Sequence, residues 1–239
     1  MKKLLVILTL FISASFAIYS YSRNSLRVDD INYFFHESKK PLNEKQLLIF
    51  HDLFQKNSKI VYETYNVKMP NEFKVNFAET ASVFAKITGK NWFTASVYSK
   101  ENDSFYFQNL AAMIKNKMLS EIISHELCHQ MLIKERKNND KQPENLMIDE
   151  AFCLSFSPIM KPAIISKKQK TKYKHFTEFQ KAINKKLLSN NKKEIYEAYN
   201  LATDWGTFAA KKAGWHKYFL LSVDKNMKEF EKIFSGYRN

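Results

Sequence analysis

The residues with the clearest chemical meaning lie at positions 125–129, where the sequence reads His-Glu-Leu-Cys-His, the pattern H-E-x-x-H. His125 and His129 are four positions apart, so on an α-helix both side chains lie on one face and can reach the same metal ion. Glu126 would lie beside that metal without binding it, where its carboxylate can take a proton from water held by the metal. Zinc lowers the pKa of such a water and polarises a carbonyl group. The pattern therefore predicts a zinc-dependent hydrolytic site with Glu126 as general base.

A catalytic zinc ion needs a third protein ligand and one open position. Glu150 is a candidate, because it follows a polar stretch that would let its helix fold back beside the helix of His129. By residue type, the alternatives are Asp149, Glu144, His175 and His216. The longer metzincin pattern is excluded, because positions 132 and 135 hold leucine and glutamate instead of glycine and histidine. Residue types alone therefore leave the third ligand open.

Hydrophobic spacing predicts a mostly helical C-terminal part that carries these residues. From Leu110 to Leu132 apolar residues recur at helical spacing, and the run decays into a polar loop at 134–141. Four further helices are expected at 146–156, 176–188, 194–212 and 217–234, with Gly214 as a C-cap. The H-E-x-x-H pattern thus falls inside a predicted helix, which is the context that it requires.

The N-terminal part is predicted to be mixed. Residues 42–65 show helical spacing, and 79–88 form a short helix closed by a glycine. Residues 73–77 alternate apolar and polar, which is typical of a half-buried strand, while aromatic runs at 92–98 and 104–108 predict a β-hairpin. The fold class expected is α+β: a small mixed sheet with a β-hairpin, followed by a mostly helical C-terminal part.

Composition excludes several other classes. The chain has 239 residues but only 4 glycines, which leaves few positive-φ turns and argues against a β-sandwich, barrel or propeller. Neither G-x-G-x-x-G nor G-x-x-x-x-G-K occurs, so the common nucleotide-binding loops are absent from the sequence.

The N-terminus is typical of a targeting segment. Two lysines precede an apolar run at 4–11, and small residues stand before a cleavage site that follows Ala17. We therefore expect a signal peptide at 1–17, a single domain at 18–239 and export to the periplasm or the medium. An uncleaved N-terminal membrane anchor is the alternative.

The chain carries a formal net charge of +14 at pH 7. In an exported protein such a charge suits an anionic cell-envelope surface better than nucleic acid. A plain solvated face is the simpler explanation of the lysine runs. The densest lysine run, 167–174, predicts a loop or the start of a helix. Nucleic acid is thus not an expected partner, and the sequence indicates no oligomeric state.

The chain holds two cysteines, Cys128 and Cys153. In an exported protein they could form one disulfide, because Cys128 lies in the predicted metal helix and Cys153 lies one turn after Glu150. Two buried free thiols are the alternative.

Two segments carry a family resemblance. Ser124–Gln130 with its H-E-L-C-H core, and Met147–Phe152, which reads M-I-D-E-A-F, resemble the gluzincin metallopeptidases and, more narrowly, the small peptidase-MA-like proteins. The likeness extends from about Phe73 to Gly214, but only these two segments are specific. It implies a zincin-like fold and zinc held by His125, His129 and Glu150, with Glu126 as general base.

This sequence departs from the family pattern at two positions. Ala151 stands where the family usually has glycine, and Leu154 stands where some gluzincins have an aspartate that supports a histidine ligand. The resemblance also implies that Tyr199, on a later helix, stabilises the oxyanion. Tyr196 and His216 are its rivals, and a place in the core is the alternative for an aromatic residue on a helix.

The resemblance implies hydrolysis of a peptide or protein substrate that binds along the edge of the sheet. Phe105–Gln108 is the candidate edge strand, with a buried strand as the alternative. The alternative function is a catalytically silent zinc-binding protein of the cell envelope with the same fold. A helical protein with an accidental motif is a further one.

Overall fold

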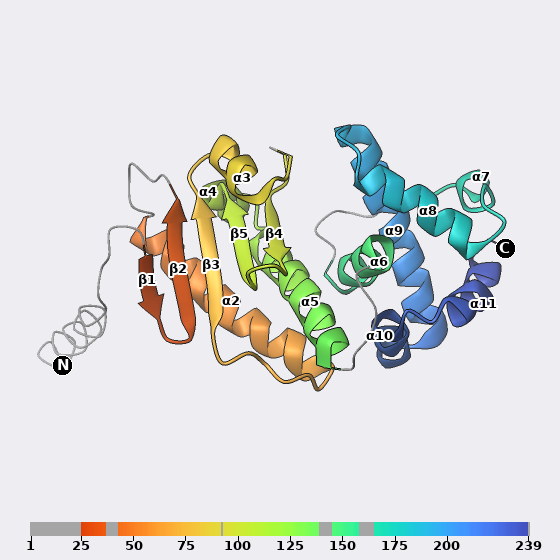
Figure 1. The fold of residues 1–239 in the computed structure, drawn as a ribbon, viewed down its shortest axis with the longest axis horizontal. Coiled ribbons are helices and arrows are strands. Elements are labelled where there is room, and N and C mark those ends of the chain that lie inside the picture. The colour runs from red at the N-terminus through yellow and green to blue at the C-terminus, as the bar shows by residue number, and fades with distance from the viewer. Residues whose placement is uncertain (1–24, 37–42, 92, 139–144, 158–164, 239) are drawn as a thin grey trace, which may run out of the picture. The chain divides into compact units, whose positions relative to one another are not determined.

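The structure is a computed structural model that describes residues 25–36, 43–91, 93–138, 145–157 and 165–238 (Figure 1). The chain divides into two compact units. The sheet unit comprises Met1–Asn43 and Pro70–Asn109, and the helical unit comprises Glu44–Met69 and Leu110–Asn239. The predicted signal peptide at 1–17 lies outside the described residues, and the single domain expected at 18–239 stays a prediction.

The sheet unit holds a five-stranded mixed sheet in the order β1-β2-β3-β5-β4. Its strands are β1 (Ser25–Val28), β2 (Ile31–His36), β3 (Phe73–Ala78), β4 (Ser96–Ser99) and β5 (Ser104–Gln108). β2 and β5 run parallel to β3, while β1 and β4 pair antiparallel with their neighbours. The predicted hairpin is confirmed as β4–β5. The β1–β2 hairpin was not predicted, and it turns at Asp29 with a φ of 51°.

β5 is not an edge strand, so the prediction that Phe105–Gln108 offers a substrate-binding edge is wrong. The strand pairs with β3 on one side and with β4 on the other, and all its residues are buried. Its main-chain groups are therefore engaged in the sheet, and a peptide cannot add to it. β3 is also more buried than the expected half-buried strand, since Lys74 alone of its residues is exposed.

One helix, α3 (Ala81–Thr88), accompanies the sheet in this unit. Thr80 caps its N-terminus by accepting a hydrogen bond from the main chain of Val83, and Gly89 ends it at a φ of 66°. Phe84 packs with Tyr106 of β5. The short helix predicted here, including its glycine, is confirmed.

All the described helices except α3 belong to the helical unit. They are α2 (Glu44–Thr64), α4 (Leu110–Lys115), α5 (Leu119–Asn138), α6 (Leu146–Phe156), α7 (Lys167–Lys170), α8 (Phe176–Leu187), α9 (Lys192–Ala213), α10 (Trp215–Asp224) and α11 (Met227–Tyr237). The mixed α+β class with a small mixed sheet is thus confirmed. No helix among the described residues is both long enough and apolar enough to cross a membrane.

Two predicted helices are in fact pairs. The helix expected from Leu110 breaks between α4 and α5, where Lys117 has a φ of 56°, and the helix expected at 217–234 breaks between α10 and α11 at Lys225, with a φ of 49°. Apolar spacing continues across both breaks, and neither position is a glycine. The pattern therefore gives no sign of a left-handed residue there.

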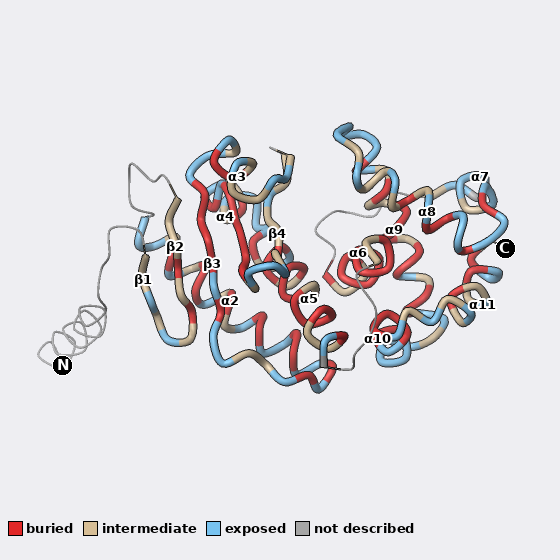
Figure 2. The backbone as a smooth tube through the Cα atoms, viewed as in Figure 1, coloured by how far each residue is buried: buried red, intermediate tan, exposed pale blue. Residues whose placement is uncertain are grey.

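The centre of the helical unit is α6, which packs against α5, α8, α9 and α10. Its residues from Met147 to Leu154 are all buried, as the red tube in Figure 2 shows. A helix buried all round is normally apolar, yet this one carries Asp149 and Glu150 side by side. Buried carboxylates are costly unless they are paired or bind a metal, so each of them needs a specific partner.

Candidate metal centre

His125 and His129 lie on adjacent turns of α5 and point at one another. Their Nε2 atoms are 3.1 Å apart, and their ring planes are nearly perpendicular, at 87°. Leu127, Cys128 and Leu132 on the same helix are fully buried, so the α5 main chain is held firmly in the core. The spacing of four residues therefore brings both imidazoles to one point, as the sequence predicted.

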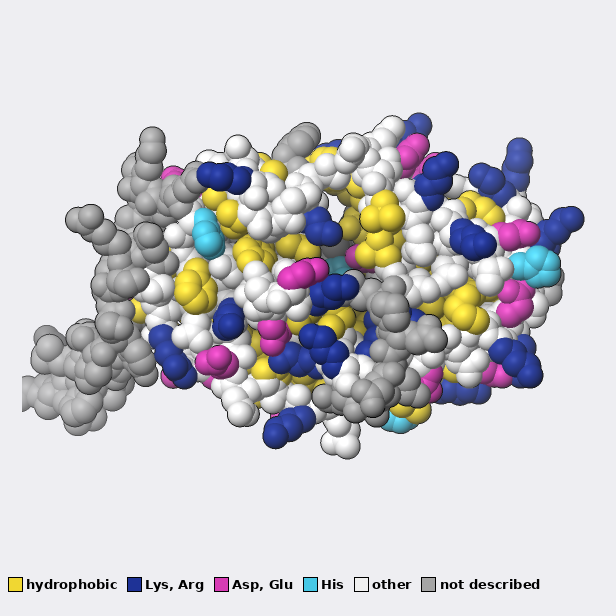
Figure 3. Space-filling model, viewed as in Figure 1, with side chains coloured by type: hydrophobic (Ala, Val, Ile, Leu, Met, Phe, Trp, Pro, Cys, Tyr) yellow, Lys and Arg dark blue, Asp and Glu magenta, His cyan; other side chains and the backbone are white. Residues whose placement is uncertain are grey.

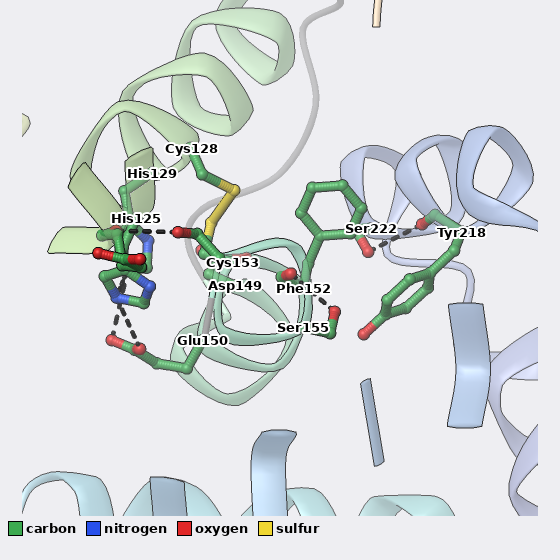
Figure 4. The surroundings of a disulfide bond; sticks show 12 residues. His125, Cys128, His129, Asp149, Glu150, Phe152, Cys153, Ser155, Tyr218 and Ser222 are labelled. Atoms are coloured by element: carbon green, nitrogen blue, oxygen red, sulfur yellow. Dashed lines mark hydrogen bonds and ion pairs between the residues drawn. A yellow bond between two sulfur atoms is a disulfide. The ribbon is translucent and has the colours of Figure 1, made fainter. Parts of the chain in front are cut away.

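Glu150 of α6 completes a triangle with the two histidines (Figure 4). Its Oε2 lies 3.4 Å from His125 Nε2, and its Oε1 lies 3.6 Å from His129 Nε2. Ligands placed about 2.0–2.1 Å from a tetrahedral zinc ion are separated by roughly 3.4 Å. Within the described part of the chain, these three residues are the one group of His, Cys, Asp or Glu side chains that could hold a metal ion. The donor set and its dimensions therefore fit such an ion.

The electrostatics of the site favour a cation. Burial lowers the pKa of His125, but the hydrogen bond to Glu150 and the charges of Glu150 and Glu126 outweigh it, so the pKa lies above the ordinary histidine value. The main-chain carbonyl of Cys153 acts in the same direction. A proton and a metal ion compete for the same imidazole, so metal affinity at this site should depend on pH.

Asp149 is excluded as a ligand by its own partner. Arg136 of α5 donates from Nη1 to Asp149 Oδ2 at 2.7 Å and from Nη2 to Oδ1, and both side chains are buried. Arg136 Nη2 also donates to the carbonyl of Ser222 in α10 at 2.8 Å. The two adjacent carboxylates of α6 thus face different partners, Asp149 an arginine and Glu150 two histidines.

The other alternative ligands lie elsewhere. His175 is exposed and contacts Glu231, with 3.2 Å between His175 Nδ1 and Glu231 Oε1. His216 is exposed at the start of α10. Glu144 lies outside the described residues. Among the described alternatives, the structure therefore brings only Glu150 to the histidine pair.

Glu126 is buried and lies close to the candidate site. Its charge raises the pKa of both His125 and Tyr199, which places its carboxylate within electrostatic reach of each. Glu126 is not a member of the metal-holding group. A carboxylate near the metal ligands but outside their set can accept a proton.

Tyr199 of α9 also lies near the site. Burial raises its pKa well above the ordinary tyrosine value, and the charges of Glu150 and Glu126 raise it further. Its hydroxyl group is therefore protonated at neutral pH and can donate a hydrogen bond. Of its rivals, Tyr196 is 41% exposed with Lys192 over its ring, and His216 is exposed on α10.

Gly206 explains how α9 reaches the site. A Cβ added at Gly206 would lie 2.0 Å from the carbonyl oxygen of Ala151, so only glycine permits this approach of α9 to α6. Tyr199 precedes Gly206 by about two helical turns and thus shares its face of α9. Ala151 directly follows Glu150, so the contact brings that face of α9 to Glu150. The departure from the family's glycine at Ala151 is accompanied by a glycine on the facing helix.

Two residues that shape the site, Arg136 and Gly206, are not indicated by the sequence pattern. Arg136 falls in 134–141, which was predicted as a polar loop, but α5 continues to Asn138 and Arg136 is buried. The one sequence feature that sets Arg136 apart is that it is an arginine in a stretch whose other basic residues are lysines. Gly206 stands inside a predicted helix, where glycine lowers the stability of the helix. A glycine at such a position indicates that another part of the chain packs closely against it.

The two cysteines form a disulfide between α5 and α6, with Cα atoms 5.6 Å apart. The alternative of two buried free thiols is therefore wrong. In Figure 4 the bridge lies beside the histidine pair and Glu150.

Comparison of the sequence with protein-family models gives no match, and comparison with curated proteins gives none either. Function is therefore inferred from the geometry of the site.

Proposed function

We propose that the chain is a zinc-dependent metallopeptidase of the gluzincin type with a zincin-like fold. The observation that carries the proposal is the convergence of His125, His129 and Glu150, with ligand atoms 3.1–3.6 Å apart, beside the non-ligand Glu126. Two imidazoles and one carboxylate are a donor set of catalytic zinc sites. The same set also occurs in ferrous-iron enzymes, but a buried carboxylate poised outside the ligand set favours hydrolysis.

Each residue has a distinct part in this proposal. The two histidines and Glu150 would hold zinc, which supplies a water of lowered pKa and polarises the carbonyl of the scissile bond. Glu126 takes a proton from the attacking water and delivers it to the leaving amine. Tyr199 keeps its proton and donates a hydrogen bond to the oxygen that becomes negative when water adds to the carbonyl.

The proposed compartment is outside the cytoplasm. The Cys128–Cys153 disulfide supports it, because such bonds persist in oxidising compartments. The partner proposed is a peptide or protein substrate, with an anionic cell-envelope surface as a second one. On the face drawn in Figure 3, Lys and Arg side chains are spread among other residues and do not gather in one patch. A contact between this face and an anionic surface would therefore use dispersed charges.

Metal removal tests the proposal. We expect purified protein to contain one zinc ion per chain by elemental analysis and to hydrolyse casein or members of a peptide library. A chelator should abolish hydrolysis, and added zinc should restore it. Protein that keeps zinc yet cleaves no library member would support the alternative, a catalytically silent zinc-binding protein of the cell envelope. Protein that binds no zinc would contradict both.

Replacing Tyr199 by phenylalanine should lower kcat about 10²–10³-fold, the usual effect of removing one oxyanion donor, and leave KM and zinc content nearly unchanged. Tyr196→Phe is the matched control, because Tyr196 lies on the same helix but is exposed, and it should keep full activity. Steady-state kinetics on one cleaved peptide would measure both variants. Equal kcat values for the two would remove Tyr199 from the mechanism.

A further inference from the structure

α5 and α6 run antiparallel. Besides the contacts of Glu150 with the two histidines, three side-chain connections between described residues join them along their length. Near the start of α5, Ser157 Oγ, just after α6, donates to the carbonyl of Glu121 at 2.9 Å. Near its end, Arg136 binds Asp149. Between them lies the disulfide Cys128–Cys153, the one covalent link.

The disulfide is the connection closest to the metal ligands. Cys128 follows His125 by three residues, and Cys153 follows Glu150 by three residues, so each cysteine shares a helix face with a ligand. Figure 4 shows the sulfur atoms beside the ligand group.

The positions of the three proposed ligands depend to different degrees on how α6 packs against α5. The two histidines belong to one helix, whose own spacing sets the distance between their rings. Glu150 comes from a different helix, so its distance from the histidines depends on how α6 is placed against α5. A helix that shifts by a fraction of a turn would carry the carboxylate out of ligand range, because a helix turns through roughly 100° per residue.

We propose that the Cys128–Cys153 disulfide is a positioning device that holds Glu150 at the metal site. This inference rests on the metal site of the proposed function, and it assigns a role at that site to the disulfide. Both cysteines are fully buried, so a reductant reaches them only when the helices part. The bridge is therefore a permanent part of the oxidised site and not an exposed switch.

A double-mutant cycle on zinc affinity tests the proposal. Zinc Kd is measured by competition with a coloured chelator for the unaltered chain, for C128A/C153A, for E150Q and for the three changes together. Removing the bridge should raise Kd about 10–100-fold, as loss of a supporting group does in metal sites. In the E150Q background it should change Kd by less than about twofold, because the group it positions is already lost.

If the increase in zinc Kd of the triple variant equals the product of the increases in C128A/C153A and E150Q, the proposal is wrong. The bridge would then act on the histidines or on the fold as a whole. An unchanged Kd in C128A/C153A would overturn the proposal too. Ser157→Ala is the control, since it removes an α5–α6 connection that lies further from the ligands along both helices than the bridge does, and it should leave Kd unchanged. These readouts do not depend on hydrolysis, so an inactive chain that binds zinc would contradict the peptidase proposal alone.

Folding is checked by circular dichroism for each variant. If C128A/C153A loses its helical signal, C128V/C153A refills part of the space left by the sulfur atoms and enters the same cycle. If both variants remain unfolded even with saturating zinc, the bridge serves the fold in general and the proposal is wrong.

Discussion

Replacement of Glu126 by glutamine should lower kcat for peptide hydrolysis by about 10²–10⁴-fold, the range for loss of a general acid–base group. The same variant should bind zinc as tightly as the unaltered chain, because Glu126 lies outside the metal-holding group. Glutamine has nearly the same size and can still form hydrogen bonds, but it cannot accept the proton of the attacking water. Kinetics on one cleaved peptide, combined with elemental analysis, would measure both effects.

Glu121→Gln is the matched control for this experiment. Glu121 lies on the same helix but is exposed, and its contact with Ser157 uses its main-chain carbonyl, which the substitution keeps. The control should therefore retain activity and metal. Normal turnover in the Glu126 variant would show that another group handles the proton, and loss of zinc would show that Glu126 supports the ligands.

Part of the candidate site could be predicted from the sequence, because the positions of two of its residues are set within one helix. Four residues of spacing on a helix bring His125 and His129 together, and apolar spacing around them indicates the helix. The third ligand needed a long-range fact, the packing of α6 on α5, which spacing alone could not supply. The family resemblance selected Glu150, and the structure places it at 3.4 Å and 3.6 Å from the two histidines.

The parts of the fold that were missed depend on tertiary contacts or on unusual main-chain angles. β1 and β2 are short, and most of their side chains are only partly buried, so they lack a strong alternating pattern. Lys117 and Lys225 adopt left-handed angles that the residue type does not favour. The sequence left β5 open between an edge strand and a buried strand, because strand order is set by pairings between distant segments, β3 among them.

The two buried carboxylates of α6, Asp149 and Glu150, have different partners and therefore different roles. Adjacent helical residues point in directions about 100° apart, so Asp149 and Glu150 cannot face the same partner. Asp149 is satisfied by Arg136, a permanent cation of the chain itself. Glu150 instead faces two imidazoles, which are groups that can bind a proton or a metal ion. One carboxylate therefore supports the packing of α5 against α6, and its neighbour is available to hold a metal ion.

Conservative amides at these two positions should therefore give opposite results. Asp149→Asn leaves Arg136 buried without its counter-charge, which typically costs about 3–5 kcal/mol of unfolding free energy. The folded fraction of that variant should still bind zinc with nearly normal affinity. Glu150→Gln removes a metal ligand, so the zinc Kd should rise by more than the roughly 100-fold that loss of a supporting group can cause. The metal-free Glu150 variant should lose less unfolding free energy than the Asp149 variant, because an imidazole can release its proton when its counter-charge is lost, whereas the guanidinium of Arg136 cannot.

Urea denaturation of the metal-free proteins and chelator competition with zinc would separate the two effects in one pair of variants. Each variant differs from the unaltered chain by one amide, and the two positions are adjacent on one buried helix, so differences in size or exposure do not confound the comparison. A Glu150 variant that keeps its zinc while the Asp149 variant loses it would contradict the ligand assignment. The proposed gluzincin mechanism would fail with it, because the histidine pair would then have a different third partner.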